Sequence, residues 1–62
     1  MKLIKLAEVK EITGLGRSTI YNFIKDGIFP KQVELGPRAV AWVEEEVLEW
    51  IEGKISARDN AA

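Results

Sequence analysis

The amino-acid sequence predicts a mainly α-helical fold with a small β-hairpin, and three observations support this class. Apolar residues recur at helical spacing in two short segments and in one longer segment near the C-terminal end. Glycines separate the two short segments. A Gly-Pro pair lies between two stretches in which polar and apolar residues alternate, which is typical of a hairpin. At 62 residues the chain is expected to form one domain, near the lower size limit for an independent core.

The first helix is predicted over residues 6–13. Leu6, Val9 and Ile12 recur at three-residue spacing, and charged residues fill the other side. Gly14 follows at the place where a helix can end in the left-handed conformation. We expect the three apolar residues to be buried against the next helix.

The second helix is predicted over residues 17–25, with Gly16 as an N-cap that has no side-chain acceptor. One sector of this helix is formed by Thr19, Ile20, Phe23 and Ile24. The opposite sector has no aliphatic residue and consists of Arg17, Ser18, Tyr21, Asn22 and Lys25. A helix of this kind packs one face on a core and offers hydrogen-bond formers on the other.

A hairpin and a third helix follow. Pro30 makes its predecessor extended, and residues 32–35 and 38–43 read as two strands joined at Gly36-Pro37. The third helix is predicted from Glu44 to about Ile55, with acidic residues in its first turn, where the helix dipole favours them. Its apolar stripe consists of Val43, Val47, Trp50, Ile51 and Ile55, widened by Leu48. Residues 56–62 lack apolar periodicity and are expected to form a frayed tail beyond a domain of residues 1–55.

The composition excludes several function classes. The sequence has no cysteine and no histidine, so disulfides, the usual zinc ligands and the usual neutral-pH general base are missing. No phosphate-loop or dinucleotide motif is present, so no cofactor and no metal are implied and we expect no enzymatic activity. The apolar run at the start is too short for a signal peptide, and no membrane span is expected, which favours a cytoplasmic location.

Charge is distributed unevenly along the chain. Residues 1–43 carry seven basic and four acidic side chains, whereas residues 44–62 carry two basic and six acidic ones. Binding to a polyanion depends on the local field more than on the net charge of −1. The first two thirds of the chain are therefore compatible with a nucleic-acid partner.

Two short helices joined by Gly14-Leu15-Gly16, followed by a hairpin, predict a winged helix-turn-helix. In such folds the second helix enters the major groove of double-stranded DNA, where Arg17 suits guanine or phosphate, Asn22 suits adenine, and Ser18 suits either role. The residues expected to reach the phosphate backbone are Tyr21, Lys25 and, at the hairpin entrance, Lys31. Arg38 at the hairpin tip suits a wing on the backbone or in the minor groove. Two alternatives stay open: Arg38 as a solvated turn residue, and Tyr21 as a half-buried residue with only its hydroxyl exposed.

The sequence resembles the AlpA family of small phage and prophage regulators over residues 3–58. The resemblance is carried by LGRSTIY at 15–21, GIFPK at 27–31, LGPRAVAW at 35–42, and the pairs Glu46-Val47 and Trp50-Ile51. It implies a winged-helix fold similar to excisionases and to the DNA-binding part of MerR-type regulators. It also implies DNA binding through Arg17, Ser18, Tyr21 and Asn22, with Arg38 on the wing, and a role in activating prophage genes or directing excision.

Two departures from the family pattern weaken the expected affinity. Gly16 replaces a frequent capping serine, and Asn22 stands where a basic residue is frequent. With about five useful cations, one copy is expected to bind DNA weakly, because affinity follows the number of phosphates neutralised. Adjacent copies on paired or repeated sites would compensate.

An alternative function of a different class rests on the third helix. Its glutamates form either a solvated face or an acidic surface for a protein partner such as an integrase or another regulator. In that case the chain is a protein-interaction module that retains the fold. Trp42 and Trp50 lie among apolar residues and are expected to pack in the core.

Overall fold

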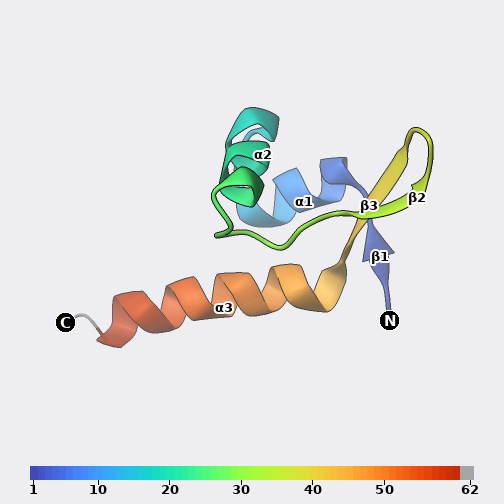
Figure 1. The fold of residues 1–62 in the computed structure, drawn as a ribbon. Coiled ribbons are helices and arrows are strands. Elements are labelled where there is room, and N and C mark those ends of the chain that lie inside the picture. The colour runs from blue at the N-terminus through green and yellow to red at the C-terminus, as the bar shows by residue number, and fades with distance from the viewer. Residues whose placement is uncertain (61–62) are drawn as a thin grey trace.

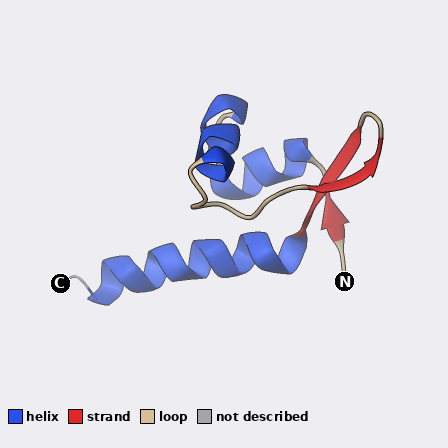
Figure 2. Cartoon of the chain, viewed as in Figure 1, coloured by secondary structure: helices blue, strands red, loops and turns tan. Residues whose placement is uncertain are grey.

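The computed structural model describes residues 1–60 and confirms the predicted fold class of three helices with a β-hairpin (Figures 1 and 2). The elements in order are β1 (Leu3–Ile4), α1 (Leu6–Thr13), α2 (Arg17–Lys25), β2 (Val33–Gly36), β3 (Ala39–Val43) and α3 (Glu44–Asn60). The short helices α1 and α2 pack together, and α3 runs along the other side of the linker that connects α2 to the hairpin (Figure 1).

The sheet contains a strand that the sequence did not reveal. Its order is β1-β3-β2 with both pairings antiparallel, so β3 is the central strand. The hairpin of β2 and β3 agrees with the prediction, whereas the sequence does not predict β1. This strand forms only two residue pairs with β3, Leu3 with Val43 and Ile4 with Trp42. Two residues are too few to show the alternation that identifies a strand. This added strand places Ile4 in the core.

Every element except β2 contributes to one core. Six residues are at most 5 % exposed and contact one another: Ile4, Val9, Ile20, Phe29, Trp42 and Val47. Five come one each from β1, α1, α2, β3 and α3, and Phe29 comes from the linker. Because interiors are close-packed, this shared cluster fixes the helices relative to the hairpin.

The turn between α1 and α2 has the predicted geometry. Gly14 adopts the left-handed conformation with φ of 73°, and its N–H donates to the Lys10 carbonyl at 2.8 Å. The Thr13 hydroxyl donates to the Val9 carbonyl at 2.8 Å and accepts from the Leu15 N–H at 3.1 Å. Leu15 packs against the core. These contacts hold the two helices in a defined helix-turn-helix.

The expected burial of Ile12 is wrong, because this side chain is 36 % exposed. Three residues fall about 60° short of a full helical turn. Leu6 and Ile12 therefore point to either side of Val9 and not in the same direction. Val9 alone is completely buried, and Leu6 is half-buried. On α3, Leu48 and Ile55 are likewise exposed, at 41 % and 44 %.

The predicted end of the third helix is also wrong, since α3 continues from Ile55 to Asn60. Residues 54–60 contain no proline or glycine, and every residue from Glu52 to Asn60 is exposed. A fully exposed helix has no apolar periodicity, which is the signal that sequence analysis uses. Residues 61–62 of the predicted tail lie outside the described residues.

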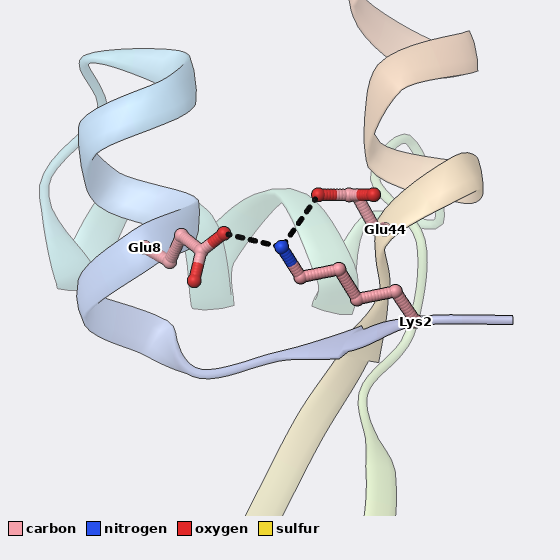
Figure 3. A network of polar contacts seen from close by, with 3 residues as sticks. All are labelled: Lys2, Glu8 and Glu44. Carbon is pink, nitrogen blue, oxygen red and sulfur yellow. Dashed lines mark ion pairs between the residues drawn. The ribbon is translucent and has the colours of Figure 1, made fainter.

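Polar contacts connect Lys2, the residue before β1, to the helices α1 and α3 (Figure 3). The Lys2 ammonium lies 3.6 Å from a Glu44 carboxylate oxygen and 4.0 Å from one of Glu8. The Glu44 N–H also donates to the Lys2 carbonyl at 2.8 Å. Exposed ion pairs contribute at most about 1 kcal/mol, so these contacts mainly fix the start of α3. Within residues 1–60, no helix combines the length and the apolar character that crossing a bilayer requires.

Candidate nucleic-acid interface

The helix α2 exposes the polar residues that the sequence singled out. Its inner face is held by Ile20, which is completely buried, and by the partly buried Phe23 and Ile24. On the outer face, Arg17, Ser18, Asn22 and Lys25 are all exposed. The helix contains no acidic residue. It therefore presents hydrogen-bond donors and positive charge on a backbone that packing keeps in place.

Tyr21 is half-buried and links α2 to the sheet. Its ring meets the Trp42 ring edge-on, with centroids 6.2 Å apart, and the Arg17 guanidinium lies 5.8 Å from the centre of the Tyr21 ring. The Trp42 indole N–H donates to the Pro30 carbonyl at 3.1 Å. The Tyr21 ring is thus partly buried, as one of the two alternatives for this residue expects, and it contacts the Arg17 guanidinium. The four-residue spacing of Arg17 and Tyr21, typical of neighbours on a helix, is the sequence signal for this contact.

Arg38 lies in the hairpin turn, as the sequence predicted. Pro37 and Arg38 connect β2 to β3, and both are exposed. The hairpin projects away from the helices in Figure 1, with its tip on the same side of the molecule as α2. An irregularity in the pairing between Glu34 and Gly36 precedes the turn. The structure thus presents one guanidinium at the end of a narrow projection.

Lys31 is placed differently from the other predicted contacts. It lines an open groove together with Pro30 and three residues of α3: Glu46, Glu49 and Trp50. The ammonium therefore shares its surroundings with two carboxylates, which offset its attraction for phosphate. No local sequence pattern indicates that Lys31 lies near Glu46 and Glu49, because the whole hairpin separates Lys31 from α3 along the chain.

The predicted core role of the tryptophans differs in degree between them. Trp42 is completely buried, whereas Trp50 is half-buried.

No group of three or more potential metal ligands occurs in residues 1–60.

These features define a small winged helix-turn-helix protein with a polar outer face on its second helix and a cation at the tip of its wing. The chain belongs to the AlpA family: residues 2–55 match the family described as prophage CP4-57 regulatory protein (AlpA). The resemblance expected from the sequence is thereby confirmed.

Two relatives are similar over most of the chain. An uncharacterized protein, ORF88, of Enterobacteria phage P4 is 46 % identical over 57 residues, covering 92 % of this chain and 65 % of the relative. The DNA-binding transcriptional activator AlpA of Escherichia coli K12 is 35 % identical over 57 residues, covering 82 % of this chain and 81 % of the relative. The chain thus spans just under two thirds of the phage P4 protein's length.

Proposed function

We propose that this protein is a sequence-specific DNA-binding regulator of phage or prophage genes and not an enzyme. The observation that carries the proposal is the outer face of α2, where Arg17, Ser18, Asn22 and Lys25 are exposed on a helix anchored by Ile20. Family membership and the printed name of the Escherichia coli relative support the same function.

In this proposal, α2 lies in the major groove and the hairpin contacts the backbone or the minor groove. Arg17 pairs with guanine or phosphate, Asn22 with adenine, and Ser18 with either a base or the backbone. Tyr21 and Lys25 contact phosphates, and Arg38 contacts the backbone or the minor groove. Lys31 makes a weaker phosphate contact because of Glu46 and Glu49. A planar guanidinium resting on the Tyr21 ring has less freedom to lose on binding than an unsupported one.

The biological output belongs to the same proposal. The protein acts in the bacterial cytoplasm on the nucleoid, either as a transcriptional regulator or as an excisionase-like factor that directs recombination. Only a few cations face the DNA, so adjacent copies on paired or repeated sites would supply the affinity that one copy lacks.

The first experiment is a mobility-shift titration with DNA from around the protein's own gene and the neighbouring attachment site, repeated over a series of salt concentrations. We expect a specific, salt-sensitive shift that Arg17→Ala weakens about tenfold or more, as loss of a bidentate base contact does. Arg58→Ala is the matched control, because it removes the same charge from the exposed outer part of α3.

Equal weakening by the two variants would show that net charge alone governs binding and that α2 does not read sequence. Absence of any shift beyond that with random DNA, even at low salt, would overturn the proposed function.

A further inference from the structure

An open groove of about 500 Å³ lies between α3 and the linker that leads into the hairpin. It is lined by Pro30, Lys31, Glu46, Glu49 and Trp50. In Figure 1, α3 runs along the lower side of the molecule, whereas α2 and the hairpin tip lie on the upper side. Three of the lining residues thus belong to the helix that lies opposite α2 in this view, and Lys31, Glu46 and Glu49 are exposed.

The floor of the groove is an aromatic ring in a fixed position. Trp50 packs edge-on against Phe29, with centroids 4.8 Å apart, and more loosely against Phe23 at 6.3 Å. Its indole N–H donates to the Ile28 carbonyl. A cation already approaches this ring, because the Lys54 ammonium lies 5.3 Å from its centre. The half-buried ring is thus held by its neighbours and attracts positive charge.

The carboxylates of Glu46 and Glu49 line the groove together with the Trp50 ring. Glu46, Glu49 and Trp50 share one helix face because their positions are three and four residues apart. Within residues 1–60, the ion pairs involve other carboxylates, those of Glu8, Glu44 and Asp59. Lys31 also lines the groove, so its two carboxylates exceed its one lining cation by a single charge. The surroundings are more acidic still, since Glu45 and Glu52 lie on the same helix.

We propose that this groove binds an arginine-bearing segment of a partner protein, with a guanidinium stacked on Trp50 and paired with Glu46 and Glu49. Arginine fits better than lysine because its planar group stacks on an aromatic ring and at the same time donates to carboxylates on either side. The glutamates repel a nucleic-acid backbone, so the surface is complementary to a basic protein segment and not to DNA. This role adds to DNA binding and does not depend on it.

The structure provides a spectroscopic probe for the test. Trp50 is half-buried at the groove and Trp42 is completely buried, so a fluorescence change on ligand addition reports on Trp50. The full chain is titrated with a short capped peptide rich in arginine, and with a matched peptide in which glutamine replaces each arginine. We expect a saturable change with the arginine peptide and none with the glutamine peptide. The NMR signal of the Trp50 indole N–H should shift in parallel, while that of Trp42 stays in place.

Two charge-matched double variants locate the site. Glu46→Gln with Glu49→Gln removes both groove carboxylates, and the expected loss is about tenfold in peptide affinity, as for two exposed ion pairs. Glu45→Gln with Glu52→Gln removes the same charge from exposed positions that do not line the groove, and should weaken binding by less than about twofold. All four residues are on the surface of α3, so these variants should keep the fold, which circular dichroism verifies.

Three results would overturn the proposal. Equal weakening by the two double variants would mean that the whole helix attracts the peptide without a defined site. Equal binding of both peptides would exclude recognition of a cation. A Trp50 signal that depends on protein concentration without peptide would show that a second copy of the chain covers the groove. Binding of DNA by the groove variant, measured separately, keeps failure here distinct from failure of the proposed DNA-binding function.

Discussion

The helices α2 and α3 meet the core in different ways. The shorter helix α2 has nine residues, buries Ile20 completely and packs Phe23 and Ile24 against the core. The longer helix α3 has 17 residues, yet Val47 is its one completely buried residue, and Glu52 to Asn60 are all exposed. Packing therefore holds α2 along its length and α3 only over its first half.

Because of this difference in packing, side chains on α2 are held in defined positions, whereas those on the outer half of α3 are only exposed to solvent. On α2, the Arg17 guanidinium lies over the Tyr21 ring, and this ring packs edge-on against the buried Trp42. Packing in the core therefore limits the motion of side chains on the outer face. On the outer half of α3, helical structure depends on local propensity, which is marginal for a short helix in water. We expect substitutions in the two regions to have very different consequences.

The largest effect is expected for Trp42→Ala. It removes a completely buried ring and the hydrogen bond to the Pro30 carbonyl, at a cost of about 3 to 5 kcal/mol in the free energy of unfolding. That is comparable to the total stability of about 3 to 9 kcal/mol for a domain of this size, so the variant should be largely unfolded. Trp50→Ala, at a half-buried position, should cost about half as much. Urea unfolding followed by circular dichroism compares them, and equal losses would contradict the division between the helices.

Tyr21 provides the next test, because its ring and its hydroxyl have separable roles. Tyr21→Ala removes the support of Arg17 and should lower DNA affinity about tenfold, by the loss of a positioned bidentate contact. Tyr21→Phe keeps the ring and should lower the affinity by less than Tyr21→Ala does, because it removes only the hydrogen bond of the hydroxyl to phosphate. Mobility shifts measure both, with circular dichroism to verify folding. If both variants lose the same affinity, the hydroxyl acts alone and the ring does not position Arg17.

Arg38 and Lys31 separate an isolated cation from one that is offset by carboxylates. Arg38→Ala should reduce the slope of log affinity against log salt by about one, as loss of one phosphate contact does. Lys31→Ala should change the slope by about half of that or less, because Lys31 lies beside Glu46 and Glu49. The salt series of the mobility-shift experiment gives both slopes. A larger change for Lys31 would place the linker, and not the hairpin tip, on the DNA.

Much of the fold could be predicted because the signals were local. The bounds of α1 and α2 follow from apolar spacing and glycines, and Gly36-Pro37 marks the hairpin. The strand β1 could not be predicted, since its two residues become a strand only by pairing with Val43 and Trp42. The outer part of α3 could not be predicted because residues 56–60 are all exposed, and a helix without a buried face has no apolar periodicity.

The exposure of the polar side chains on α2 could be predicted from the sequence, whereas their contacts with other elements could not. The polar face of α2 could be identified because Ile20 and Phe23 mark the opposite side. The edge-on contact of Tyr21 with Trp42 depends on where β3 lies, and the position of Lys31 beside Glu46 depends on where α3 lies. These are tertiary contacts between segments far apart in the chain, so no local pattern encodes them.

A small gain in stability is expected where α2 begins. Gly16 has φ of −79° and ψ of 165°, a side chain added there would meet no atom within 4 Å, and the helix has no side-chain cap. Gly16→Ser should therefore raise the free energy of unfolding by about 0.3 kcal/mol by accepting a bond from a free N–H of the first turn. Gly14→Ser is the matched control, because at φ of 73° it should cost about 1 kcal/mol. Urea unfolding gives both values, and a loss of stability with Gly16→Ser would show that the N-terminus of α2 does not accept a cap.

A similarly small effect on stability is expected for Ala57→Pro in the outer half of α3. Proline inside a packed helix costs about 3 kcal/mol or more, because it removes a backbone hydrogen bond and clashes with the preceding turn. Here the affected turns are exposed and contribute no residue to the core cluster, so helicity should fall while the free energy of unfolding changes by less than about 0.5 kcal/mol. Circular dichroism reports the helicity and urea unfolding the stability. A loss near the full proline penalty would mean that the outer half of α3 folds cooperatively with the core, and the contrast between α3 and α2 would then be one of exposure and not of stability.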